Sequence, residues 1–578
     1  MSTLPTHYLG ISTGPVVDTI LSARKTRELW TASYLFSTLM RELVRAALNN
    51  GLEVWSPTSP GVYTAQSTSL APAAAPPEVP SSSLFGAGIY HDRLYAAYTA
   101  PGGGSPEELQ TKFVAIRDEA IKATTDQLAG GAAFFKDFFR IAHVWLPQGN
   151  ASANLLGDLN GLLDTQELFP ALLSPDNLKQ NALVDLLEKP YRATMVQRGL
   201  AANAQNTYNE ISAAHTRSGV RLLFDFFPST AQIASVDLYH KNDAAYQALQ
   251  TDIVGTSEFK APESQEELTD GSTDDPLSDN AVLQEFYRRL DNKEVPAFRD
   301  HFQDFHKYFC IVHADGDHFG QVIEGLGNDR LAIERFSGQL ANFAAAAATV
   351  INDHGGRAIY IGGDDLLFFA PVAYGTKTVF DLINAIDDTF KEACSFTPQP
   401  SLSYGVTLSH YKYPLFEAKS DSYAALERAK SFKWKRGETK GAKDAIAFRF
   451  IRHSGSFFTG VMDKPLLQKF LEVRTLRTEQ DFLSSFTFKL QELEPLIDAL
   501  GASLTEERLQ NIINNFFDEP IHGQNRAALN KLIELYTCIN ELSGSLDDPD
   551  FAPRRNTYAI LRLMTFTLPK TTPAHVLA

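Results

Sequence analysis

The chain has 578 residues, of which 44% are hydrophobic, and its formal net charge at pH 7 is −17. A chain of this length is expected to form three or four domains. The acidic balance argues against a general nucleic-acid binder, which needs a broad basic field, although it leaves room for local basic patches. No apolar stretch approaches a membrane span and no signal-peptide pattern opens the chain, so we expect a cytoplasmic protein that does not enter a membrane.

Three cysteines occur, Cys310, Cys394 and Cys538, and all are far apart in sequence. A disulfide framework or a cysteine-rich zinc site needs several cysteines at short, regular spacing. We therefore interpret the three as small buried hydrophobic side chains and expect no zinc.

The first 130 residues alternate strand-like and helix-like patterns and are predicted to form one domain. Strands are expected at 8–13, 52–57 and 93–100, and helices at 15–50 and 105–128. Pro15 suits the first helical position, where the missing N–H costs nothing. The Pro-, Ala- and Ser-rich stretch at 56–84 is expected to be a loop inside this domain.

Two further regions are dominated by helical patterns. Residues 131–257 are predicted to form a mostly helical domain, and residues 456–578 a separate C-terminal helical domain. The stretch 258–282, which follows the first of these regions, is strongly acidic, and this composition is typical of a solvated linker.

Residues 283–455 carry the clearest alternation of elements. Strands are expected at 308–314, 357–362, 366–371 and 401–409, with one helix ending near 353 and another at 376–394. This β-α-β-β-α-β order is the ferredoxin-like pattern, here extended by a helix at 415–431 and a strand at 445–451. The first 130 residues begin in the same order. We therefore predict fold class α+β, with two ferredoxin-like domains and helical domains between and after them.

The segment 362–365 reads GGDD and forms the turn between two of these strands. The first strand of a ferredoxin-like sheet lies beside this hairpin, and here it ends at Asp315. Adjacent strands lie about 4.8 Å apart, so Asp315 is expected close to Asp364 and Asp365. Carboxylates this close repel one another and raise each other's pKa, and a divalent cation such as Mg²⁺ or Mn²⁺ removes that cost.

The chemistry of such a cluster is that of nucleotidyl transfer. Two metal ions held by carboxylates activate a 3′-hydroxyl and neutralise a triphosphate. Gly362 and Gly363 permit a tight turn and a close approach of phosphate to the backbone. A basic segment supplies cations for the triphosphate; its members are Arg428, Lys430, Lys433, Lys435, Arg436, Lys440 and Lys443. Lys430 and Lys443 have the most defined positions, since one ends a helix and the other precedes a strand.

Several long motifs resemble the large subunit of type III CRISPR RNA-guided complexes, in its Cmr-type (III-B) branch. They are GPVVDTILSARKTRELWTASYLFS, HADGDHFG, YIGGDDLLFFAP, SYGVTLSHYKYPLFEA and ALERAKSFKWKRGETKGAKDAIAFRFIRHSG. The motifs occur in order over about two thirds of the chain. The resemblance implies two Palm-type ferredoxin-like domains and an enzyme that polymerises ATP into cyclic oligoadenylate when its complex binds target RNA. The implied partners are other Cmr-type subunits, a CRISPR guide RNA and the target RNA.

The resemblance also implies site residues. In the second Palm, Asp315, Asp364 and Asp365 would be the catalytic metal ligands, with the backbone of Gly316 as a further ligand and Asp317 as a weaker candidate. Lys430 and Lys443 would lie near the nucleotide. In the first Palm, the segment that would face a second nucleotide contains Gly14, Pro15, Arg24, Lys25 and Ser33.

The sequence departs from the family pattern in two places. Many members begin with a histidine–aspartate nuclease domain, but the first strand here starts at residue 8, so we expect no such nuclease. The lone pair His91-Asp92 falls inside the first Palm, where the hairpin lacks the GGDD of the second. Many members also carry a four-cysteine zinc motif, which three cysteines cannot form.

Three other functions remain alternatives. The same site would conjugate AMP to S-adenosylmethionine if that molecule were the acceptor. A diguanylate cyclase shares the fold, but it has an asparagine where this chain has Ile323. A non-catalytic scaffold would have no use for the carboxylate cluster, which costs stability without a cation.

Overall fold

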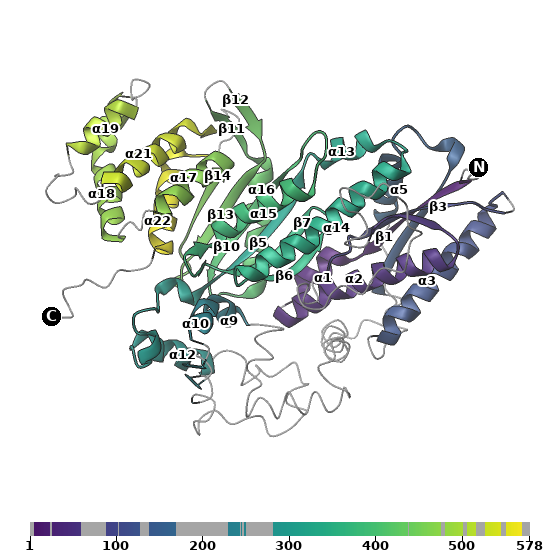
Figure 1. Ribbon diagram of the computed structural model, residues 1–578, viewed down its shortest axis with the longest axis horizontal. Coiled ribbons are helices and arrows are strands. Elements are labelled where there is room, and N and C mark those ends of the chain that lie inside the picture. The colour runs from purple at the N-terminus through teal and green to yellow at the C-terminus, as the bar shows by residue number, and fades with distance from the viewer. Residues whose placement is uncertain are drawn as a thin grey trace.

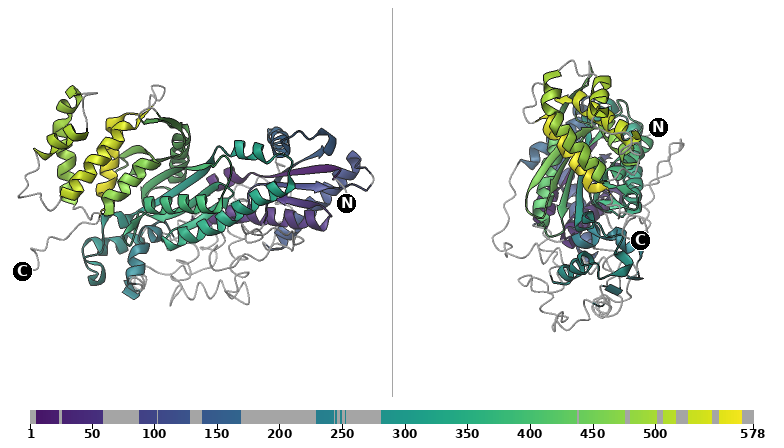
Figure 2. Two further views of the ribbon diagram at one scale, coloured as in Figure 1. Left: turned by 45° about the horizontal axis from the view of Figure 1, so that its top comes forward. Right: turned by 90° about the vertical axis from the view of Figure 1, so that its left-hand side faces the viewer.

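The computed structural model describes the greater part of the chain. The described residues are 5–23, 26–58, 88–101, 103–127, 138–168, 229–242, 244–245, 248–249, 252, 281–436, 439–475, 480–500, 506–515, 526–544 and 551–568. They form an elongated molecule, with one sheet at the N-terminal end, a larger sheet in the middle and the C-terminal helices at the other end (Figure 1, Figure 2). Within these ranges no helix is both long and apolar enough to cross a bilayer.

The larger sheet has six strands in the order β14-β13-β10-β5-β7-β6. The strands are β5 (Tyr308–Asp317), β6 (Arg357–Gly362), β7 (Asp365–Pro371), β10 (Ser401–His410), β13 (Ala445–Ile451) and β14 (Phe457–Asp463). The helices around it are α13 (Phe319–Leu326), α14 (Arg330–Asp353), α15 (Val379–Ala393) and α16 (Leu415–Ser431), and a small ribbon is formed by β8 (Ala373–Tyr374) and β9 (Lys377–Thr378). The four strands β10-β5-β7-β6 have the ferredoxin-like order that the sequence predicts.

The central strand β5 is buried on both faces, which explains its nearly continuous apolar sequence. Cys310 and Val312 point into the core formed with α14 and α15. Phe309 and Ile311 point to the opposite face, where α16 and the N-terminal helices pack. Because side chains alternate along a strand, Asp315 lies on this second face, toward the N-terminal domain.

The N-terminal sheet repeats the same topology on four strands, in the order β2-β3-β1-β4. Its strands are β1 (His7–Gly14), β2 (Glu53–Ser56), β3 (Arg93–Tyr98) and β4 (Arg140–Pro147). Its helices are α1 (Val16–Ser22), α2 (Thr26–Asn49) and α3 (Pro106–Gln127), and α5 (Leu155–Glu167) covers the other face. The predicted fold class of two ferredoxin-like domains is therefore confirmed.

The end of the first domain and its first expected helix both differ from the prediction. β4 completes the first sheet, so this domain extends beyond residue 130 into the region predicted as a helical domain. β4 was missed because it is an edge strand whose side chains are mostly half-buried, which removes the alternating pattern. The expected helix 15–50 is two helices, because the chain is extended at Ala23.

Much of the predicted helical domain, of the Pro- and Ala-rich loop and of the acidic linker lies outside the described residues. Within the described part, α9 (Thr230–Ala234), α10 (Val236–Lys241) and α12 (Ala281–Asp291) form a small cluster at the base of the second sheet. Short 3-10 helices occur at Gln148–Asn150, Pro296–Phe298 and Asp304–Lys307.

The C-terminal region is helical as predicted, but it is not separate from the second sheet. Its helices are α17 (Lys464–Thr475), α18 (Gln480–Leu500), α19 (Glu506–Asn514), α21 (Arg526–Glu541) and α22 (Pro553–Thr567). They share one hydrophobic core with the sheet, and β14 lies beyond the expected boundary at 455. A three-stranded ribbon joins the two parts: β12 (Thr439–Ala442), β11 (Lys433–Arg436) and β15 (Ser543–Gly544).

The two ferredoxin-like domains are held together by backbone hydrogen bonds and one buried lysine. Gly88 donates its N–H to the carbonyl of Ile359 at 3.2 Å and accepts from the N–H of Ile361 at 2.8 Å. Lys419 on α16 is only 3% exposed, and its Nζ donates to three carbonyls at the end of α1, those of Ile20, Leu21 and Ala23. A cation at the end of a helix satisfies carbonyls that have no helical partner. Lys419 therefore fixes α1 against the second domain.

We predict that Lys419→Met destabilises this interface. The substitution keeps most of the side-chain volume but removes the donor from three carbonyls, at an expected cost of about 1–3 kcal/mol in the free energy of unfolding. Urea denaturation of the full chain measures the change. Lys391→Met, at an exposed position, is the matched control and should change stability by less than about 0.5 kcal/mol. Equal effects of the two substitutions would contradict this role of Lys419.

Candidate active site

The carboxylates named from the sequence come together in the second sheet where β5 ends and β7 begins. β5 ends at Asp317 and β7 begins at Asp365, and the two strands pair directly, with Ala314 opposite Leu366. Asp364 lies in the turn before β7, with its Oδ2 where a Cβ on Gly316 would be. Asp315 and Asp364 are therefore neighbours, and only a glycine between them leaves room for the second carboxylate.

The environment of these groups disfavours their negative charge. Burial, with added repulsion from Asp315 and Asp365, raises the pKa of Asp364 to about 7. Burial also raises the pKa of Asp315, and the contact with Lys430 opposes that shift. A group whose pKa is raised in this way is relieved by a nearby cation.

The structure places a cation in this cluster, the ammonium group of Lys430. It forms an ion pair with Oδ2 of Asp315 and donates to the carbonyl oxygen of Gly316 at 3.1 Å. These are two of the oxygen atoms that the resemblance names as metal ligands. The ammonium group thus stands where a divalent ion would bind, so the donor set fits Mg²⁺ or Mn²⁺.

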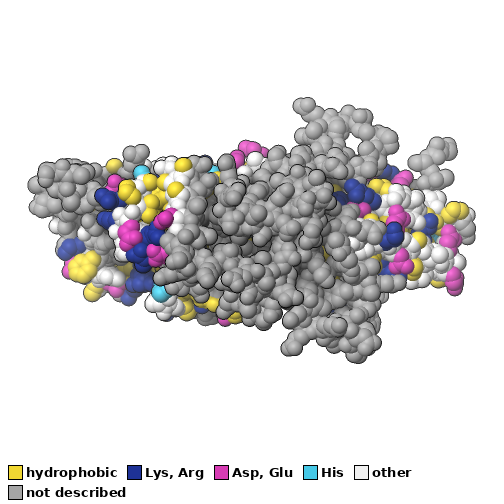
Figure 3. All heavy atoms as spheres, turned by 90° about the horizontal axis from the view of Figure 1, so that it is seen from below, with side chains coloured by type: hydrophobic (Ala, Val, Ile, Leu, Met, Phe, Trp, Pro, Cys, Tyr) yellow, Lys and Arg dark blue, Asp and Glu magenta, His cyan; other side chains and the backbone are white. Residues whose placement is uncertain are grey.

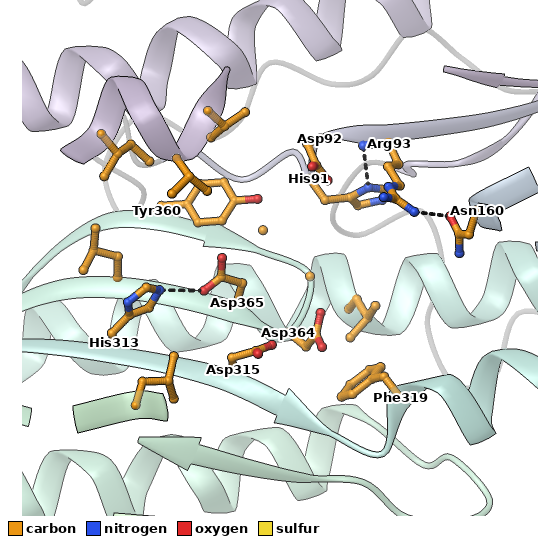
Figure 4. A pocket seen from close by; sticks show the side chains of 18 of the residues that line it. His91, Asp92, Arg93, Asn160, His313, Asp315, Phe319, Tyr360, Asp364 and Asp365 are labelled. Atoms are coloured by element: carbon orange, nitrogen blue, oxygen red, sulfur yellow. Dashed lines mark hydrogen bonds and ion pairs between the residues drawn. The ribbon is translucent and has the colours of Figure 1, made fainter. Parts of the chain in front are cut away.

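The third carboxylate points differently. Oδ1 of Asp365 lies 3.2 Å from Nε2 of His313, which is on β5 and on the same face of the sheet (Figure 4). Among the described residues, no three acidic, His or Cys side chains converge closely enough to hold an ion as they stand. Asp365 would therefore have to turn from His313 to join Asp315 and Asp364 as a ligand.

Asp317 has a structural environment that separates it from the cluster. Its side chain is fully buried, and its Oδ2 accepts hydrogen bonds from Ser401, Ser403 and the N–H of Asp444. Among the described residues, its other oxygen has no hydrogen-bond partner. Asp317 therefore anchors the turn that precedes β13, and it does not line the cavity described next.

A cavity of about 410 Å³ opens between the two domains above the carboxylates, a volume within the range of small-molecule sites. From the second domain it is lined by His313, Asp315, Tyr360, Gly362, Gly363, Asp364 and Asp365. From the first it is lined by Val16, Val17, Ile20, Leu21, His91, Asp92, Arg93 and Tyr95. Figure 4 shows Asp92 and Tyr360 across the cavity from Asp364 and Asp365. The site thus has walls from both ferredoxin-like domains.

From the sequence, Asp92 was named only in the His91-Asp92 pair of a nuclease motif that is not expected here, and Tyr360 was not named. Burial is the main cause that raises the pKa of Asp92, and the negative charge of Asp365 raises it further. The two carboxylates therefore interact electrostatically across the cavity. Tyr360 has a pKa raised well above its usual value by burial and by the same acidic groups. Position was the available signal: Asp92 precedes the third strand of the first sheet, as Asp364 precedes that of the second.

His91 beside Asp92 is held as a neutral side chain. Its Nε2 lies 3.1 Å from the hydroxyl of Ser56, and burial together with the charge of Arg93 lowers its pKa to about 4. It therefore contributes a hydrogen-bonding ring to the wall and no charge near pH 7.

The other candidates of the first domain are placed less directly at the site. Gly14 and Pro15 lead into α1, whose next residues line the cavity. Arg24 and Lys25 lie outside the described residues. Ser33 is 1% exposed, and its hydroxyl donates to the carbonyl of Ile359 at 2.7 Å, so the structure gives it an interdomain contact in place of the implied nucleotide contact.

Neither Lys430 nor Lys443 is among the residues that line the cavity. Lys430 contacts Asp315, as described. Lys443 donates its backbone N–H to the carbonyl of Phe432 at 2.8 Å, in the left-handed conformation with φ of 62°. The next residue, Asp444, also has a positive φ and is bonded to Asp317.

Two family models match the chain. Residues 308–446 match the Cas10/Cmr2 second palm domain, and residues 8–97 match the N-terminal region of the CRISPR-associated protein Cmr2. The Cmr2 subunit of the CRISPR system Cmr of Pyrococcus furiosus is 28% identical over 188 residues, which are 28% of this chain and 21% of that protein. The alignment therefore spans about a fifth of that relative's length.

Solved structures show the same fold over nearly the whole chain. A chain of the type III-B Cmr-beta complex in the apo state has a TM-score of 0.61 at 14% identity, covering 97% of this chain and 82% of that one. For type III-B Cmr-beta bound to cognate target RNA the TM-score is 0.57 at 12% identity, covering 98% and 83%. The fold and the carboxylate-bearing turn define a protein with two Palm-type domains. Residues 8–97 and 308–446 are thus similar to the Cas10/Cmr2 family of CRISPR-associated proteins, and the solved Cmr-beta structures share the fold of the chain.

We predict that Gly316→Ala damages the site without unfolding the domain. The added methyl group would overlap Oδ2 of Asp364 and the ring of Phe319, so Asp364 would be displaced. Titration calorimetry should show Mn²⁺ affinity reduced by about 10- to 100-fold. Gly320→Ala is the matched control, since nothing lies within 4 Å of its added Cβ, and it should bind Mn²⁺ like the unmodified chain. Unchanged affinity in Gly316→Ala would show that the ion binds elsewhere.

Proposed function

We propose that this chain is the nucleotidyltransferase subunit of a Cmr-type CRISPR complex, which makes cyclic oligoadenylate from ATP when the complex binds target RNA. The observation that carries the proposal is the position of the Lys430 ammonium group, which contacts both Asp315 and the carbonyl of Gly316. This position is next to Asp364 and below a cavity shared by two Palm-type domains. Two bound Mg²⁺ or Mn²⁺ ions would supply charge neutralisation and activation of the attacking hydroxyl.

In this proposal the carboxylates act as ligands and Lys430 acts on phosphate. Asp315, Asp364 and the Gly316 carbonyl would hold the metal ion, and Asp365 would join them by turning from His313. Lys430 would then leave Asp315 and bind the triphosphate, for which an ammonium group with three donors is well suited. The left-handed Gly363 and the small Gly362 leave the backbone of the turn open to a phosphate group.

The first domain supplies the opposite wall for the second reactant. Asp92 and His91 present polar groups to the cavity, while Val16 and Ile20 present apolar ones. A mostly apolar wall with a few placed polar groups is the usual character of a small-molecule site. We propose that the molecule whose hydroxyl attacks ATP lies against this wall, which makes the first Palm a binding domain and the second the catalytic one.

The acceptor decides between two products of this one site. With a second ATP as acceptor the product is an oligoadenylate, and with S-adenosylmethionine it is an AMP conjugate. The proposed partners are the other Cmr-type subunits, the guide RNA and the target RNA. The scaffold alternative is disfavoured because the Asp364 carboxylate would be kept buried beside two others with no role.

The joint substitution Asp364→Asn and Asp365→Asn should abolish synthesis. The assembled complex is supplied with target RNA, ATP and Mg²⁺, with and without S-adenosylmethionine, and products are identified by mass spectrometry. Loss of two ligand charges should reduce the rate at least about 100-fold. Asp353→Asn with Asp388→Asn is the control with the same change of charge at exposed positions. Full activity of the Asp364/Asp365 variant would overturn the site assignment, and no nucleotide product from the unmodified complex would overturn the function.

Lys430→Met should separate metal binding from turnover. Removing the competing ammonium group leaves Asp315 and the Gly316 carbonyl free, so Mn²⁺ affinity should rise by roughly fivefold, the equivalent of about 1 kcal/mol. The rate of synthesis should fall in the same variant, because the triphosphate loses its cation. Calorimetry and the product assay give the two readouts. A parallel fall of both quantities would argue that Lys430 is only a structural partner of Asp315.

A further inference from the structure

The ribbon β11–β12 carries three lysines on one face. Lys433 and Lys435 are two residues apart on β11 and so point to the same side, and Lys440 on β12 pairs directly with Lys435. Trp434, between the first two, points to the other side and packs against the core of the second domain. The lysine face, meaning Lys433, Lys435 and Lys440, is therefore the solvent side of the ribbon, and all three residues are exposed.

The lysine face is electrostatically unfavourable as it stands. Within the described part of the chain, none of its three ammonium groups has a carboxylate or other hydrogen-bond partner, whereas Lys307, Lys464 and Lys531 each contact an acidic side chain. Like charges directly opposite each other on paired strands are destabilising, and Lys435 and Lys440 are such a pair. In a chain with a net charge of −17, this local excess of positive charge is unusual.

Protection of a sheet edge explains only part of this local excess of positive charge. Lysines on edge strands discourage unwanted strand pairing, and β12 is an edge strand of its three-stranded sheet. β11, however, is the central strand: β12 pairs along one side of it, and β15 pairs with Trp434 and Lys435 on the other, so edge protection does not account for Lys435. Lys435 therefore needs another explanation, and an anionic ligand supplies one.

The ribbon is fixed beside the carboxylate site at both of its ends. Lys430, three residues before Lys433, is bonded to Asp315 and to Gly316. Directly after β12, Lys443 is bonded through its backbone to Phe432, and Asp444 to Asp317. The third strand, β15, pairs with β11 and follows α21, so it joins the ribbon to the C-terminal helices.

We propose that Lys433, Lys435 and Lys440 bind the phosphodiester backbone of an oligonucleotide. Lys433 and Lys435 lie about 6.8 Å apart along the strand, and Lys440 stands about 5 Å across from Lys435, so successive phosphates of a flexible single strand can each meet one ammonium group. On the face that Figure 3 presents, the basic and acidic side chains that are coloured lie interspersed. The oligonucleotide is either the product of the adjacent site or RNA held by the complex. Binding by the lysine face does not require the proposed activity.

The test is binding of two fluorescent probes to the purified full chain, followed by anisotropy as a function of salt. One probe is an adenylate decamer and the other an RNA decamer of mixed sequence. The variant carries Lys433→Gln, Lys435→Gln and Lys440→Gln. Three lost phosphate contacts should weaken binding at least tenfold at about 0.1 M salt and reduce the slope of log affinity against log salt by about 2. A thermal melt checks folding, and the melting temperature should be unchanged or higher because the Lys435–Lys440 repulsion is removed.

The matched control carries Lys293→Gln, Lys391→Gln and Lys489→Gln, which changes the net charge equally at other surface positions. It should bind both probes like the unmodified chain. A loss confined to the adenylate probe assigns the face to the product, and an equal loss for both probes assigns it to RNA in general. The proposal is overturned if the unmodified chain binds neither probe at low salt, if the slope is unchanged in the lysine-face variant, or if the control variant loses as much.

Discussion

The geometry of the site depends on how the two Palm-type domains meet. One carbonyl group, that of Ile359, receives both the N–H of Gly88 and the hydroxyl of Ser33, and Lys419 ties the end of α1 to α16. Ile359 lies on β6, the strand that runs into the carboxylate-bearing turn. They set the distance between the first-domain wall and the carboxylates, so the cavity exists only while the interface is intact.

The second constraint is electrostatic. The carboxylates of Asp92, Asp315, Asp364 and Asp365 line a partly enclosed space, and burial raises the pKa of Asp364 to about 7. Such a cluster is stable only with a cation inside it, and the chain provides Lys430 for that position. In the proposed function, a metal ion bound at this position would replace the ammonium group, and Lys430 would then be free to contact phosphate.

The sequence predicted the parts of the fold that depend on local pattern and strand order. The strands around Asp315 and Asp364 are strongly apolar and well separated, so their β-α-β-β-α-β order and the meeting of the two motifs could be inferred. Edge strands such as β4 were missed because their half-buried side chains lack a clear period. Contacts between distant segments also could not be predicted from the sequence. Ser33 bonds to a residue 326 positions away, and Lys419 bonds to one 399 positions away. The wall formed by Asp92 depends on those same contacts.

The most direct test is a crystal of the full chain grown with Mn²⁺ and a non-hydrolysable ATP analogue, examined by anomalous scattering from manganese. The account predicts anomalous density between Asp315, the Gly316 carbonyl and Asp364, with Asp365 turned from His313 and the ammonium group of Lys430 moved from Asp315 onto a phosphate. Manganese bound elsewhere, or an ion pair between Lys430 and Asp315 that persists with nucleotide in the cavity, would contradict it.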